Sequence, residues 1–132
     1  MSHEPITNYI YQLADQLQSV GATVDLFAVR LPVAGRVHYV GWCAECATTH
    51  TAPLIDVNEP VAKHALMTLA HEAGHLRSWA DFGQDDTLTR HHREALAYLY
   101  GWNVLRELDA PITPQDWFEH HRHEFKGDGS KP

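Results

Sequence analysis

The chain has 132 residues, of which 44% are hydrophobic and 20% are charged, and its formal net charge is −7. This length suits one domain with a hydrophobic core and leaves no room for a second. With only 10 Lys and Arg residues and no basic run, the chain is a poor candidate for tracking nucleic-acid phosphates. No apolar stretch approaches the ~20 residues that span a bilayer, and no signal-peptide pattern begins the chain. We therefore expect a cytoplasmic protein with neither a nucleic acid nor a membrane as partner.

The first predicted element is an amphipathic helix near the N-terminus. Its apolar residues recur at three- and four-residue steps over residues 6–20, and Gly21 follows as a C-terminal stop. The pattern then changes to β-branched and aromatic residues over 23–31 and 36–42, separated by turn-forming residues. These two runs predict a hairpin.

A third strand is predicted over residues 53–57, and the proline of Asn58-Glu59-Pro60 suits the first turn of a following helix. That helix, over about 60–80, has an apolar stripe, so polar residues beside the stripe lie at the border of a buried face. The stripe consists of Val61, Ala65, Leu66, Leu69, Ala70 and Ala73.

Two more helices are predicted towards the C-terminus. The first covers about residues 87–108, with apolar residues from Leu88 to Leu105, Leu99 among them, at helical spacing. The second opens at Thr113-Pro114-Gln115-Asp116, which has a cap, a first-turn proline and an acid three residues on. It is predicted to continue to about Glu124. We expect residues 1–125 to form a single domain and residues 126–132 to form a flexible tail.

The motif His71-Glu72-Ala73-Gly74-His75 carries the chemistry of this sequence. In a helix, residues i and i+4 lie one turn apart on the same face, so both imidazoles can aim at one point. Glu72 lies about 100° round the helix, where a carboxylate can take a proton from metal-bound water instead of binding the ion. The H-E-x-x-H pattern therefore predicts His71 and His75 as metal ligands and Glu72 as the catalytic base.

A hydrolytic zinc site usually takes three protein ligands, so a third must be found. Glu94 is the preferred candidate, because the helix that carries it can pack antiparallel to the motif helix. Asp81 is the main alternative, at the position where longer motifs place a third histidine, and His91 and His92 are the others. The side chains near enough in sequence to stabilise a tetrahedral oxyanion are Tyr98, His91, His92 and Arg93. Zn²⁺ is the expected cofactor, with manganese, cobalt and iron as alternatives.

The segment from residue 53 to about residue 108 resembles the ImmA/IrrE-type metallopeptidases, a gluzincin-like group of bacteria, mobile elements and phages. The similar pieces are a strand, a helix with Leu69-Ala70-His71-Glu72-Ala73-Gly74-His75, and a later helix with Glu94-Ala95. By position, the resemblance implies that His71, His75 and Glu94 bind zinc and that Glu72 is the general base. Gly101-Trp102-Asn103 stands where the family usually has Leu-Met-Pro, and no helix-turn-helix segment is present.

We therefore expect an α+β fold, a minimal zincin-like domain. An N-terminal helix and a three-stranded sheet support the motif helix, which packs on a second metal-ligand helix, and a short C-terminal helix follows. The strand over residues 54–57 is either an edge strand that pairs with an extended peptide or an ordinary strand of the core sheet.

The expected activity is zinc-dependent hydrolysis of a peptide bond in a specific intracellular protein, of regulatory or host origin. The alternatives are a non-catalytic, zinc-stabilised protein-interaction module that uses the same ligands, and a metal-free helical protein.

Trp42-Cys43-Ala44-Glu45-Cys46 has three interpretations. It resembles the redox motif of thioredoxin-like proteins, although the residues that follow make a poor helix. Alternatively, Cys43, Cys46 and His50, with His38 as a fourth ligand, form a small structural zinc site. The preferred interpretation is two reduced thiols in a turn between strands.

The run His120-His121-Arg122-His123 lies on the last predicted helix. Adjacent side chains diverge on a helix, so only His120 with Glu124, or one histidine with a distant partner, could chelate a metal. The preferred interpretation is a solvated helix face. Trp79, Trp102 and Trp117 are spread over three predicted helices, where core packing explains them.

Overall fold

The computed structural model describes residues 6–25, 35–38, 41–43, 48–50, 54–57, 62–82 and 89–127. The helices in this part of the chain are α1 Ile6–Ser19, α2 Ala62–Phe82, α3 Arg90–Leu108 and α4 Pro114–Gly127. The strands are β1 Thr23–Asp25, β2 Gly35–His38, β3 Gly41–Cys43, β4 Thr48–His50 and β5 Leu54–Val57. The protein is mostly helical and belongs to the predicted α+β class. None of the described helices has an apolar stretch long enough to cross a bilayer.

α1 forms where the periodicity predicts it and buries one apolar stripe, which consists of Ile10, Leu13, Ala14 and Leu17. Gly21 ends the helix as expected. Its φ of 100° lies in the left-handed region, which glycine adopts without a Cβ clash. The Ala22 N–H then donates to the Leu17 carbonyl at 3.0 Å, a common way to satisfy the last carbonyls of a helix.

The sheet is arranged differently from the expected hairpin. β5 lies between β1 and β2, in parallel with β1 and antiparallel to β2. The hairpin prediction is therefore wrong, because the two runs that should pair are separated by a strand from later in the chain. A second pair, β3 and β4, is antiparallel, and β4 was not predicted. Since β5 is paired along both edges, it is a strand of the core sheet, and the alternative that it adds an extended peptide is wrong.

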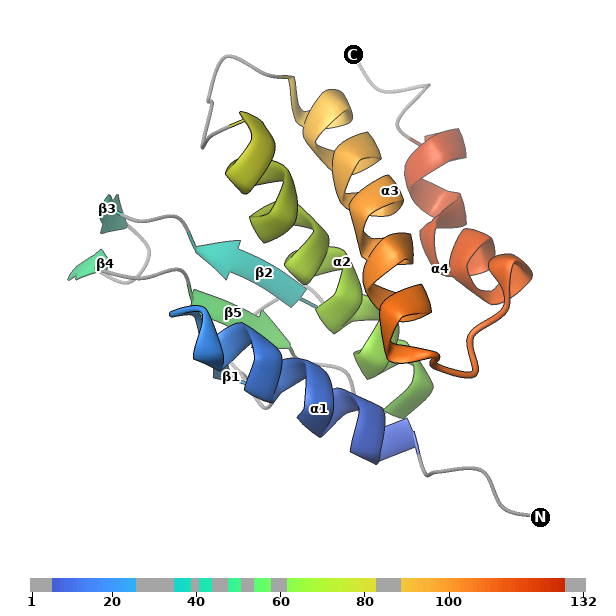
Figure 1. The fold of residues 1–132 in the computed structure, drawn as a ribbon. Coiled ribbons are helices and arrows are strands. Elements are labelled where there is room, and N and C mark those ends of the chain that lie inside the picture. Colours follow the sequence, from blue (N-terminus) through green and yellow to red (C-terminus); the bar gives the residue numbers. More distant parts are fainter. Residues whose placement is uncertain are drawn as a thin grey trace.

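α2 is the central element of the fold. Figure 1 shows it between α1 and the sheet on one side and α3 on the other. Every residue from Ala65 to His75 is buried, so the motif lies inside the core rather than at the border of a one-sided stripe. A helix that is surrounded by other elements needs small or apolar residues on all of its faces. The segment Ala65-Leu66-Met67-Thr68-Leu69-Ala70 has this composition. The polar groups of the motif must therefore find their partners within the protein.

Two glycines allow α2 and α3 to approach closely. A Cβ added to Gly74 would lie 2.5 Å from the Ala97 carbonyl oxygen and 2.7 Å from the Gly101 nitrogen. A Cβ added to Gly101 would lie 2.8 Å from the Ala70 carbonyl oxygen and 3.0 Å from the Trp117 ring. Any larger residue at either position would force the backbones apart.

The buried face of α3 includes Ala97, Gly101, Val104 and Leu108. Leu105 of the predicted stripe is buried, but Leu99 is 60% exposed, so the predicted face is wrong in part. Ala97 and Gly101 mark the part of the buried face where the close approach of α2 leaves no space for a larger side chain.

α4 begins with the predicted capping box. The Thr113 hydroxyl accepts from the Asp116 N–H at 3.0 Å, and the Asp116 carboxylate accepts from the Thr113 N–H at 3.1 Å. Trp117, one turn into the helix, is 1% exposed and belongs to the hydrophobic core, as predicted. α4 continues to Gly127, so the predicted tail begins inside the helix, and residues 128–132 lie outside the described part of the chain.

Candidate metal centre

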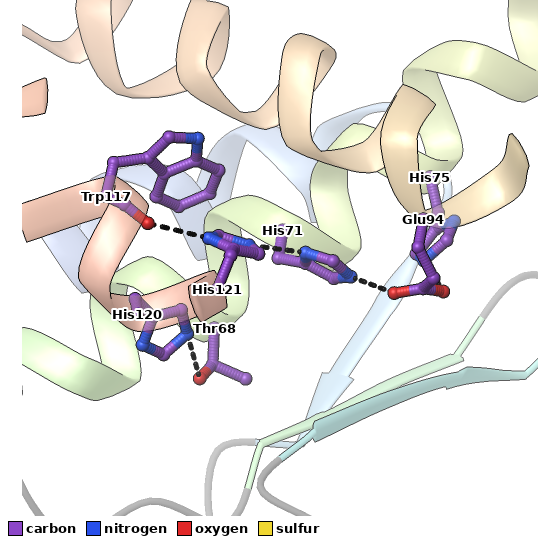
Figure 2. Close-up of polar contacts among 7 residues, drawn as sticks. All are labelled: Thr68, His71, His75, Glu94, Trp117, His120 and His121. Carbon is purple, nitrogen blue, oxygen red and sulfur yellow. Dashed lines mark hydrogen bonds and ion pairs between the residues drawn. The ribbon is translucent and has the colours of Figure 1, made fainter. Parts of the chain in front are cut away.

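The structure brings together His71 and His75 of α2 and Glu94 of α3. One potential ligand atom from each lies within 4.8 Å of the other two. The histidines are one helical turn apart on α2, and the contact at Gly74 holds α3 near enough for Glu94 to reach both of them. Figure 2 shows the three side chains converging from the two helices. Two imidazoles and a carboxylate could bind a metal ion.

Glu94 joins the two imidazoles. Its Oε1 lies 2.8 Å from His71 Nε2 and its Oε2 lies 3.2 Å from His75 Nε2. His71 and His75 are 8% and 5% exposed, so these contacts are shielded from solvent. Burial alone would raise the pKa of Glu94, but hydrogen bonds from the two histidines outweigh it and hold that pKa well below its usual value. Glu94 is therefore ionised, as a metal ligand must be.

The other nitrogen of His71 contacts a residue that was predicted to lie on a solvated helix face. His71 Nδ1 lies 2.8 Å from Nε2 of His121 on α4, and His121 Nδ1 lies 2.8 Å from the Trp117 carbonyl oxygen (Figure 2). His121 is 2% exposed, and burial lowers its pKa to about 3, so its ring is neutral. The prediction of a solvated face is therefore wrong for His121, which α4 turns into the core.

A signal for His121 was present in the sequence. It lies four residues after Trp117, so the two share a helix face. Because Trp117 was expected in the core, the same face should carry His121 inwards.

The hydrogen bonds of His71 set what its Nε2 can do. A carbonyl only accepts, so His121 Nδ1 carries its proton, and Nε2 of the neutral ring accepts from His71 Nδ1–H. His71 Nε2 then faces the Glu94 carboxylate at 2.8 Å, and two acceptors at that distance need a cation between them. That cation is either a proton, which makes His71 an imidazolium, or a metal ion.

His75 provides a second indication that the residues fit a metal. Among the buried side-chain polar atoms of the described residues, His75 Nδ1 is the one without a hydrogen-bond partner. An unpaired buried polar atom costs about 1–3 kcal/mol and calls for an explanation. Metal binding through the other nitrogen, Nε2, explains the unpaired Nδ1, because a binding site is arranged for its ligand rather than for stability.

Glu72, the predicted base, is 7% exposed and follows His71 on α2. It is not a member of the three-residue group. Its role as the catalytic base therefore stays a prediction.

The alternative third ligands lie elsewhere. Asp81 is exposed and accepts a hydrogen bond from the Tyr100 hydroxyl at 2.6 Å. His91 and His92 are exposed in the first turn of α3, where the His92 N–H donates to the capping Thr89 hydroxyl. None of the three joins His71 and His75 in the group that the described residues form.

Of the side chains considered for oxyanion stabilisation, Tyr98 packs on the α4 side of the site. Its ring lies edge-on to His121, with centroids 4.9 Å apart, and 5.7 Å from the Trp117 ring. This position makes Tyr98 a packing neighbour of His121.

The predicted second metal site lies outside the described residues. Cys46 and the side chains of Cys43 and His50 are not among them. The backbones of Cys43 and His50 pair with Thr48 and Gly41, at opposite ends of the β3–β4 ladder. The cysteine site therefore stays a prediction.

A surface depression of about 650 Å³ lies on α2 and α3 but contains none of the three grouped residues. Its lining includes Arg77 and Glu107, which form a two-point ion pair at 2.7 and 2.8 Å. Asp81 and Tyr100 in the same lining are hydrogen-bonded to each other, so the metal group is the stronger candidate for chemistry.

Comparison with protein-family models, with curated proteins and with solved structures found no match to this chain. Its function must therefore be inferred from the residues of the site.

Proposed function

We propose that this protein is a zinc-dependent metallopeptidase that cleaves a peptide bond in a specific intracellular protein. The observation that carries this proposal is the convergence of His71, His75 and Glu94 within 4.8 Å of one another. A motif helix packed against a second ligand-bearing helix, next to a small sheet, is also the arrangement of a minimal zincin-like domain. The ligand set of two imidazoles and one carboxylate favours zinc among the candidate metals.

Each residue of the motif then has a role. His71, His75 and Glu94 hold the ion, and Glu94 supplies the only negative charge among the three ligands. Zinc, when bound, lowers the pKa of coordinated water to about 7 and polarises a carbonyl group. Glu72 accepts a proton from the attacking water and passes it to the leaving amine.

The test is the Glu72→Gln variant, which keeps the size of the side chain and removes the base. We expect it to bind zinc as the wild type does, with cleavage lowered at least about 100-fold, as for loss of a general base. Metal analysis of protein purified without a His-tag measures the zinc content. Comparison of the proteomes of cells expressing the two forms measures cleavage, because a shortened protein seen only with wild type names the substrate.

The burial of both histidines favours a second candidate, a zinc-stabilised interaction module without catalysis. Structural zinc sites are closed by protein ligands and kept from solvent. The Glu72→Gln variant separates the two candidates. If the variant retains every property of the wild type and neither form shortens any protein, the module is correct. A zinc content near zero in the wild type would remove both.

A further inference from the structure

His121 is held in one orientation by its surroundings. Its Nδ1 lies 2.8 Å from the Trp117 carbonyl, within the same helix. The Trp117 ring lies edge-on with centroids 4.2 Å apart, and the Tyr98 ring at 4.9 Å. A ring packed this closely, and 2% exposed, cannot turn over without displacing its neighbours. Its Nε2 therefore points steadily at His71.

The direction of the next hydrogen bond follows from the first. The Trp117 carbonyl only accepts, so His121 Nδ1 must donate, and Nε2 of the neutral ring is left as an acceptor. His71 Nδ1, 2.8 Å away, must therefore carry a proton. The unprotonated nitrogen through which a neutral His71 can bind an ion is then Nε2, the atom next to Glu94.

The two histidines of the motif differ in this respect. His71 has a partner on α4 behind it, whereas His75 Nδ1 has no hydrogen-bond partner among the described residues. Metal-binding histidines usually donate their second nitrogen to a carboxylate, a carbonyl or water, which fixes the tautomer and the direction of the ring. At His71 the acceptor is the imidazole of His121, which itself donates to the Trp117 carbonyl.

We propose that His121 is a positioning residue of the metal centre, which holds His71 in the Nδ1–H tautomer and so directs Nε2 at the ion. This inference rests on the proposed zinc site and deepens it: α4 contributes to metal binding although it supplies no ligand. The capping box of Thr113 and Asp116 sets where α4 begins, and thereby which of its faces turns towards α2.

The test uses three variants of the full chain. His121→Phe keeps a flat ring but removes the acceptor. His121→Gln supplies an amide oxygen that can accept from His71. His120→Gln is the matched control, because His120 is the neighbouring histidine of α4, with Nε2 3.4 Å from the Thr68 hydroxyl and its ring 5.0 Å from that of His121.

Two measurements are made on each protein. Competition with a chelator gives the zinc affinity, which we expect to fall about 10- to 100-fold in His121→Phe, the range for loss of an outer partner. His121→Gln should recover most of that loss, and His120→Gln should match the wild type. Long-range ¹H–¹⁵N NMR spectra of histidine-labelled, metal-free protein, recorded at a pH high enough for His71 to be neutral, should show His71 protonated at Nδ1, with that preference weakened only in His121→Phe.

The outcomes separate this inference from the proposed function. If the wild type binds zinc tightly and His121→Phe binds it equally well, the inference is wrong and the zinc site stands. If the wild type binds no zinc, the proposed function fails and His121 has no metal centre to position, and the metal-free spectrum then decides only whether His121 sets the tautomer of His71. Should His121→Phe not fold, the wild-type spectrum decides as well, because His71 unprotonated at Nδ1 would overturn the proposal.

Discussion

Glu94 connects the two imidazoles of the motif, since each of its carboxylate oxygens faces one ring. We expect Glu94→Gln, which keeps the shape and removes the charge, to weaken zinc binding by more than about 10-fold. Loss of a residue that only hydrogen-bonds to a ligand already weakens metal binding by at least about 10-fold, and loss of a ligand should cost more. Chelator competition measures this. Asp81→Asn is the matched control, because Asp81 bonds to Tyr100 outside the group. Zinc lost from Asp81→Asn and retained by Glu94→Gln would identify Asp81 as the third ligand.

Single residues differed in how far the sequence could place them. The spacing of His71 and His75 is local, so helix geometry alone brings the rings to one face. The prediction of Glu94 as the third ligand depends on the packing of α3 against α2, which no local pattern in the sequence specifies. His121 was missed because the run from His120 to His123 was interpreted as one solvated face, although its spacing of four residues from Trp117 places His121 on the buried side of α4.

At the level of helices, the contact between Gly74 and α3 sets the distance from Glu94 to the histidines. A Cβ on Gly74 would lie 2.5 Å from the Ala97 carbonyl oxygen, so the helices must separate in Gly74→Ala. We expect a loss of roughly 1–3 kcal/mol in the free energy of unfolding, as for other overpacked sites. Zinc affinity should fall as well, because Glu94 moves away with α3.

Urea unfolding and chelator competition measure the two effects of Gly74→Ala. Gly21→Ala is the control, since its φ of 100° strains any other residue while a Cβ there has no neighbour within 4 Å. It should lower stability and leave zinc affinity unchanged. A Gly74→Ala protein as stable as the wild type, with the same zinc affinity, would show that the close approach of the helices is dispensable.

The capping box of α4 predicts a pH dependence. The backbone hydrogen bond from Thr113, followed by the contact with Lys63, lowers the pKa of Asp116. The folded pKa is below that of the unfolded chain, about 3.9. Asp116 therefore stabilises the fold above that value, and its contribution is lost as the pH falls through the folded pKa. Asp116→Asn should lower stability at pH 7 by about 1 kcal/mol, as for other caps, and by less at pH 3.

Urea unfolding at the two pH values measures this difference. Thr113→Ser keeps a capping hydroxyl and the Asp116 carboxylate, so it should retain the pH dependence of the wild type. An equal loss of stability in Asp116→Asn at both pH values would mean that the carboxylate charge plays no part.

The helices could be predicted from the sequence, whereas the order of the strands could not. Periodicity and caps act within a few residues, and α1 and α4 begin and end close to where those signals stand. Strand pairing joins distant segments, so β5 could insert between β1 and β2 without any local sign. The buried face of α3 was misplaced for a similar reason, because its small residues are explained only by the approach of α2.

For the whole molecule, the proposed ion would link three helices. α2 and α3 supply the ligands, and α4 holds His71 from behind through His121 (Figure 2). Because only the folded chain assembles this set, zinc binding should stabilise the fold. At a free zinc concentration 100 times the dissociation constant, the gain is about 2.7 kcal/mol. For a domain of this size we expect removal of zinc to lower Tm by about 10 °C.

Thermal unfolding with zinc and with a chelator measures this shift, and two variants test its origin. His75→Ala removes a proposed ligand and should abolish the shift. Glu72→Gln should retain it in full, because Glu72 lies outside the group of proposed ligands. Loss of the shift in Glu72→Gln would make Glu72 a ligand and leave the hydrolytic mechanism without its base. An equal Tm for the wild type with and without zinc would mean that the ion is not part of the folded protein.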